Sequence, residues 1–152
     1  EKDVLDIKML KQINEAKNLK IPVVIHDRDA HEDTLKIVKS ENAKEVGGVF
    51  HCYSGSVEMV KTVLNNNFYI SVGGTVTFKN ARKIIEVVEY VPIEKILVET
   101  DSPFLSPEPV RGRRNDSRNL RYIIQKISEI KKMSFEETAS ITDKNARTLF
   151  GI

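Results

Sequence analysis

The chain has 152 residues, of which 40% are hydrophobic and 30% charged, a composition typical of a globular protein with a buried core. A net charge of +2 excludes a strong overall attraction to nucleic acid, so any preference for anions must come from a local cluster. The single cysteine excludes an internal disulfide and favours a reducing, cytoplasmic compartment. No apolar run approaches the roughly 18 residues of a membrane span, so no membrane partner is expected.

The apolar residues predict helices and strands that alternate along the chain. Helical spacing marks residues 4–19, 30–41, 57–65 and 80–90. Between these segments lie four runs rich in Val, Ile and Phe, at 22–26, 47–51, 68–74 and 95–101. Most of their apolar residues are consecutive rather than alternating, which is typical of parallel strands covered on both faces. Two further helices, at 117–131 and from Ser134 to Leu149, end the chain.

This order predicts an α/β fold built from parallel βα repeats with right-handed crossovers. Two architectures fit it, a doubly wound sheet or part of a (β/α)₈ barrel. A complete barrel needs roughly 250 residues, so about four βα units would form one half. No linker is visible, and residues 1–152 are interpreted as one domain. The chain starts without Met inside a helical pattern, which suggests that it is part of a longer protein.

Three of the four predicted strands end on a residue type that binds metals. His26 ends the first strand, His51 the second and Asp101 the fourth. In parallel α/β folds the carboxyl ends of the strands form the reactive rim, so a barrel would bring these three tips together. Two imidazoles and a carboxylate are a common ligand set for a divalent ion that activates water. The sequence therefore predicts a metal site made by His26, His51 and Asp101.

Each of these residues also has a simpler interpretation. A single histidine at a strand end is usually packed at the rim, and Asp101 precedes Ser-Pro, which suits a turn. The metal hypothesis depends on the three occurring at corresponding positions. Cys52 follows His51, but neighbours on a strand face opposite ways. We therefore expect Cys52 to pack rather than to act as a nucleophile with His51 as its base.

A basic loop follows the fourth predicted strand. Residues 102–115 contain three prolines and the cluster Arg111, Arg113 and Arg114. Arginine binds phosphate through two parallel hydrogen bonds, and loops after the last strands of barrels frequently hold phosphate. The alternative is a solvated basic loop. The position directly after Asp101 favours phosphate contact.

Together these motifs resemble the TatD family of metal-dependent deoxyribonucleases, which belongs among the amidohydrolase-like barrels. The resemblance extends from about residue 20 to the end of the chain. It is carried by PVVIHDRDAHEDTL, GVFHCYSGS, YISVGGTVTFKNA, ILVETDSPFL, RGRRN and NARTLFG. Their order and spacing also resemble the family. The resemblance implies that the chain is the C-terminal half of a TIM (β/α)₈ barrel.

The resemblance also implies roles for single residues. His26, His51 and Asp101 would be metal ligands, and Asp101 would also orient or deprotonate the attacking water. One or two divalent ions, Mg, Mn or Zn, would be bound in the intact protein. Substrate phosphate would be bound by Arg111, Arg113, Arg114 and Asn115.

Two motifs of the family are absent from the chain. Family members open with a His-x-His strand, and a later strand supplies a metal-bridging Glu in a Gly-Glu-Ile-Gly-Leu-Asp context. Without them the chain lacks the first half of the barrel and about half of the ligands. We therefore expect the isolated chain to be inactive and to bind metal weakly or not at all.

The expected function of the intact protein is hydrolysis of phosphodiester bonds in DNA, removing nucleotides from an end. Two alternatives stay open: an amidohydrolase-type hydrolase of a small-molecule amide or ester, and a non-catalytic half-barrel module. DNA is the expected substrate partner. Open strand edges also predict either a homodimer or association with a missing N-terminal fragment.

Overall fold

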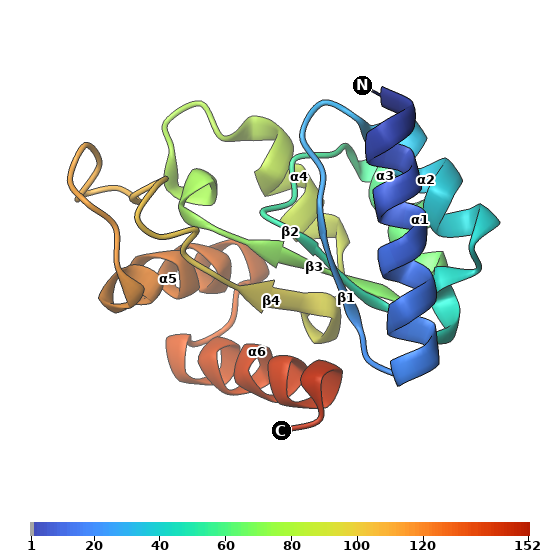
Figure 1. Cartoon of the computed structure of the whole chain (residues 1–152). Coiled ribbons are helices and arrows are strands. Elements are labelled where there is room, and N and C mark those ends of the chain that lie inside the picture. The colour runs from blue at the N-terminus through green and yellow to red at the C-terminus, as the bar shows by residue number, and fades with distance from the viewer. Residues whose placement is uncertain (1) are drawn as a thin grey trace.

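The computed structural model describes residues 2–152 as one parallel sheet flanked by helices (Figure 1). Helices and strands alternate from the start of this range, which confirms the predicted α/β fold. No helix within these residues is both long and apolar enough to cross a membrane. In chain order the elements are α1 (Lys2–Leu19), β1 (Val23–His26), α2 (His31–Ser40), β2 (Gly48–His51), α3 (Val57–Asn65), β3 (Phe68–Val72), α4 (Arg82–Tyr90), β4 (Ile96–Val98), α5 (Leu120–Lys131) and α6 (Phe135–Phe150).

The sheet follows the sequence order β1-β2-β3-β4, and each neighbouring pair of strands is parallel. Its register aligns four large apolar side chains in one row, because Ile25 pairs with Phe50, Phe50 with Ile70, and Ile70 with Ile96. All four are at most 5% exposed and lie in the core under the helices. Burying this row fixes which face of the sheet points toward the helices.

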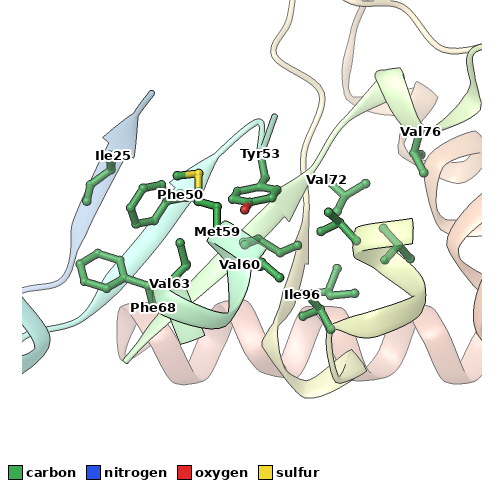
Figure 2. Close-up of a cluster of buried hydrophobic side chains, with 14 of the residues drawn as sticks. Ile25, Phe50, Tyr53, Met59, Val60, Val63, Phe68, Val72, Val76 and Ile96 are labelled. Carbon is green, nitrogen blue, oxygen red and sulfur yellow. The ribbon is translucent and has the colours of Figure 1, made fainter. Parts of the chain in front are cut away.

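Side chains from α3 complete the core on this face (Figure 2). Met59, Val60 and Val63 of this helix are buried against the sheet. The ring of Phe50 meets that of Phe68 edge to face, with ring centroids 5.4 Å apart. Ser56 caps the start of α3 by accepting a hydrogen bond from Met59 N, as helix starts require.

The two edges of the sheet differ. At the β4 edge, Asn145 of α6 is 6% exposed and donates its amide hydrogens to the carbonyl oxygens of Ile93 (2.7 Å) and Ile96 (2.8 Å). Neither edge has a further strand partner among the described residues, and at the β1 edge no side-chain hydrogen bond takes the place of those that Asn145 makes at the β4 edge. The edge at β1 is therefore the open one.

One predicted boundary is wrong in a way that matters for the site. The sequence predicts a fourth strand that runs to Asp101, but β4 ends at Val98. Glu99 N still donates to Val72 O, at 3.1 Å, after which β3 has no further residues to pair with. Asp101 therefore lies in a turn, and its φ of 55° is in the left-handed region.

Candidate metal centre

The face of the sheet opposite the core row carries the predicted histidines. His26 pairs with His51 across β1 and β2, and continuing the register by one residue places His51 opposite Ser71 on β3. Side chains alternate along a strand, so burying Ile25 and Phe50 turns the residues that follow them to the other face. The imidazole rings of His26 and His51 have centroids 5.6 Å apart.

His51 is the centre of a cluster of three ionisable side chains. Its Nδ1 lies 2.7 Å from Glu99 Oε2 and its Nε2 lies 3.3 Å from Asp101 Oδ1. The three side chains are 17–33% exposed, so they are partly shielded but still open to solvent. The turn after β4 brings Asp101 back toward β2, and this compensates for the strand ending early.

Glu99 was not among the residues predicted for the site. Its Oε2 faces His51, while Oε1 accepts hydrogen bonds from the Ser71 hydroxyl (2.6 Å) and from the backbone N–H of Cys52. The alternation of side chains along a strand places Glu99 on the same face as Asp101, and this pattern was the sequence evidence that could have indicated Glu99. It was not sufficient, because the contact to His51 depends on the turn that follows.

The donor set fits a divalent ion. Two metal–ligand bonds of about 2.1 Å can span up to about 4.2 Å, so one ion could contact both His51 Nε2 and Asp101 Oδ1. Ligand atoms of His51, Glu99 and Asp101 all lie within 4.8 Å of one another. One imidazole with two carboxylates is compatible with Zn or Mn.

His26 takes a more peripheral position than predicted. It is exposed, and it does not belong to the compact group formed by His51, Glu99 and Asp101. Its ring lies beside that of His51, as expected for neighbouring strand ends. The predicted ligand role of His26 stays a prediction.

Asn115 is tied to the protein rather than open to a ligand. It is 2% exposed, and its amide group donates to the carbonyl oxygens of Thr100 and Phe104, both at 2.7 Å. Its side-chain oxygen accepts from Asp116 N and from the side chain of Asn119. These contacts occupy the groups expected to bind phosphate, so Asn115 anchors the loop after β4.

The same loop packs closely on the end of β3. A Cβ at Gly74 would lie 2.0 Å from the carbonyl oxygen of Leu105, so no larger residue fits there. Glu108 N also donates to Thr77 Oγ1, at 2.9 Å. Paired glycines such as Gly73-Gly74 permit either a turn or the close approach of another group to the backbone. Here the group that approaches Gly74 is the backbone of the loop after β4.

The predicted phosphate-binding arginines are exposed on this loop, which extends beyond the carboxyl ends of β3 and β4 (orange in Figure 1). The guanidinium carbon of Arg111 lies 3.6 Å from the centre of the Phe78 ring. Arg113 and Arg114 have exposed side chains. Arg118, by contrast, is paired with Asp116, with Nη2 2.7 Å from Oδ2. Hydrogen bonds from the side chain and the backbone N–H of Arg118 lower the pKa of Asp116 to about 2.

Cys52 and His31 are not members of the cluster formed by His51, Glu99 and Asp101. Burial, together with the negative charges of Glu99 and Asp101, raises the pKa of the Cys52 thiol to about 12. The thiol is therefore protonated at neutral pH and is a poor nucleophile. His31, the first residue of α2, contacts the Asp27 carboxylate through Nδ1 at 2.7 Å.

Comparison with known proteins gives a consistent family assignment. The profile described as TatD related DNase matches residues 4–151. An uncharacterized metal-dependent hydrolase of Bacillus subtilis, YabD, is 48% identical over 151 residues, which are 99% of this chain and 59% of YabD. The uncharacterized metal-dependent hydrolase YcfH of Escherichia coli is 40% identical over 136 residues, covering 90% of this chain and 51% of YcfH.

Solved structures agree with the sequence comparison. The crystal structure of YjjV, a TatD homologue from Escherichia coli, superposes with a TM-score of 0.86 at 28% identity. The match covers 93% of this chain and 54% of YjjV. The chain thus spans little more than half the length of the relatives to which it is similar. From the profile match, the identities and the shared fold, the chain belongs to the TatD related DNase family.

Proposed function

We propose that the protein containing this chain is a metal-dependent hydrolase that cleaves phosphodiester bonds of DNA. The observation that carries the proposal is the cluster of His51, Glu99 and Asp101 at the carboxyl ends of parallel strands. Two relatives are named metal-dependent hydrolases, and the matching family is described by deoxyribonuclease activity.

Each residue of the cluster has a part in this chemistry. His51 Nε2 and Asp101 would hold the ion, with His26 as a further ligand from the adjacent strand. When bound, a divalent ion lowers the pKa of a coordinated water and polarises a phosphoryl oxygen. Asp101 would accept the proton of the attacking water, because its carboxylate is the more exposed of the two in the cluster, 33% against 17% for Glu99.

The loop after β4 supplies positive charge for the substrate. Arg113 and Arg114 are exposed, and Arg111 stacks on Phe78 with its hydrogen-bond donors at the rim of its guanidinium group. These arginines would neutralise phosphate charge near the scissile bond. Asn115 supports them by fixing the loop to the backbone of Thr100 and Phe104.

We further infer that the sheet is the C-terminal half of a (β/α)₈ barrel. The parallel strands in sequence order and the helices between them are what half of such a barrel requires. The superposition on 54% of YjjV is consistent with this proportion. The intact protein would add strands beside β1 and further ligands.

A chimera tests the function directly. It joins the part of YabD outside the matched region to the start of this chain, as the half-barrel proposal requires. With Mn²⁺ or Zn²⁺ we expect it to shorten a labelled DNA strand, and the matched chimera with Asp101→Asn to lose at least about 100-fold in rate. Arg111, Arg113 and Arg114 changed together to Ala should lower the rate mainly at low substrate concentration.

The rival function, hydrolysis of a small amide or ester, makes the opposite prediction. The chimera would then cleave a chromogenic ester or amide with Asp101-dependent kinetics. DNA would stay intact, and removing the three arginines would change nothing. That combination of results would overturn the nuclease proposal while keeping the metal centre.

A further inference from the structure

We propose that Glu99 is a positioning residue that holds a proton on His51 Nδ1 and thereby directs His51 Nε2 at the metal ion. The inference rests on the proposed metal centre. It goes beyond that centre by giving Glu99 a role distinct from that of a ligand, although its carboxylate lies among the potential ligand atoms.

Both carboxylate oxygens of Glu99 are already engaged. Oε2 is 2.7 Å from His51 Nδ1, and Oε1 accepts from Ser71 Oγ and from Cys52 N–H. To become a ligand, Glu99 would have to give up one of these contacts. Asp101, by contrast, has Oδ1 on the other side of the imidazole, 3.3 Å from Nε2. Glu99 therefore contacts one ring nitrogen of His51, Nδ1, and Asp101 contacts the other, Nε2.

The support of Glu99 comes from fixed parts of the sheet. Ser71 is a 5% exposed residue of β3, and the Cys52 N–H belongs to the backbone that directly follows His51. These donors point at Oε1 and leave Oε2 for the imidazole. A histidine that binds a metal commonly donates its other N–H to a carboxylate, which fixes the ring and raises its basicity. The hydrogen-bonded series Ser71–Glu99–His51 has this arrangement.

The arrangement makes a sharp prediction for Glu99→Gln, which keeps the shape of the side chain. The Cys52 N–H can only donate, and its contact with Glu99 Oε1 is shorter than its 3.1 Å contact with Ser71 Oγ, so we expect the amide oxygen of Gln to face it. The amide NH₂ then faces His51 Nδ1 and can only donate to it. His51 must accept at Nδ1 and carry its proton on Nε2, where it meets Asp101. The variant therefore places a proton on the nitrogen that should bind the ion.

The first test is nuclear magnetic resonance of the metal-free 152-residue chain with ¹⁵N-labelled histidine. Long-range proton–nitrogen correlations report which ring nitrogens carry a proton, and His51→Gln identifies the His51 signals among the three histidines. We expect His51 Nδ1 to be protonated in the natural sequence and unprotonated in Glu99→Gln. The matched control Glu94→Gln changes an exposed glutamate and should leave the His51 signals in place.

The second test is Zn²⁺ titration by calorimetry of the YabD chimera and of its Glu99→Gln and Glu94→Gln variants, because the isolated chain lacks part of the ligand set. Glu99→Gln should weaken Zn²⁺ binding by about 10–100-fold, and Glu94→Gln should leave it unchanged. An unprotonated Nδ1 in the natural sequence, or a protonated Nδ1 in Glu99→Gln, would overturn the inference. A switched proton with unchanged Zn²⁺ affinity would overturn the positioning role. If no chimera binds Zn²⁺ while the proton switches as expected in the chain, the metal centre fails and the hydrogen-bond assignment of Glu99 stands.

Discussion

His51 Nε2 and Asp101 Oδ1 lie 3.3 Å apart although one residue ends β2 and the other lies in the turn after β4. β3 separates these two strands in the sheet. The approach is possible because the chain turns at Asp101, whose φ is 55°. The site is therefore a product of the turn as much as of the strands.

Asn145 should be one of the most sensitive polar residues for stability. Its replacement by Ala leaves the carbonyl oxygens of Ile93 and Ile96 without their donor in a buried position. We expect a loss of about 1–3 kcal/mol in the free energy of unfolding. Urea denaturation measures it, and Lys144→Ala, an exposed neighbour on α6, is the control. Equal stability of the two variants would show that the hydrogen bonds at the β4 edge contribute nothing.

The loop arginines should carry a salt-dependent affinity for DNA. We expect the chain to bind a fluorescent single strand, and replacement of Arg111, Arg113 and Arg114 by Ala to weaken binding uniformly across sequences. The slope of log affinity against log salt should fall by about 0.7 for each phosphate that the variant no longer neutralises. The control changes Lys36, Lys39 and Lys44 to Ala, which removes the same charge elsewhere. If both triple variants weaken DNA binding equally, the affinity depends on net charge alone, and the predicted role of the loop arginines is wrong.

The thiol of Cys52 should react slowly at neutral pH. Burial and the nearby carboxylates raise its pKa to about 12, so the folded protein holds the thiol proton more tightly than the unfolded chain does. The resulting stabilisation is complete below the ordinary value of 9.0 and is lost as pH rises toward 12. Iodoacetamide labelling followed by mass spectrometry should show slow modification at about pH 8 and fast modification after unfolding in urea. Fast labelling of the folded chain would contradict this environment.

The open β1 edge should make the isolated chain self-associate, with a second copy as the partner. Val24 is 61% exposed on this strand, whereas Asn145 covers the opposite edge. Light scattering after size-exclusion chromatography should give a mass above 17.3 kDa that falls on dilution. Val24→Lys should shift the protein to a monomer, because edge lysines oppose strand pairing. A monomer at every concentration would contradict the prediction.

The sequence predicted the fold well because the fold depends on local patterns. Consecutive apolar residues marked every strand, and the core row through Ile25 and Phe50 determined which face carries His26 and His51. Glu99 could not be assigned in this way, because its contact with His51 depends on pairing between strands and on the turn that follows β4. Asn115 has the chemistry of a ligand-binding residue, but packing directs its amide to two backbone carbonyl groups.

A divalent ion shared by His51 and Asp101 can be located by X-ray diffraction from crystals of the YabD chimera soaked in Mn²⁺. We expect an anomalous peak in contact with His51 Nε2 and an oxygen of Asp101, absent from Asp101→Asn crystals soaked in the same way. Anomalous density elsewhere with none at this position, or a peak that persists unchanged in Asp101→Asn, would contradict it.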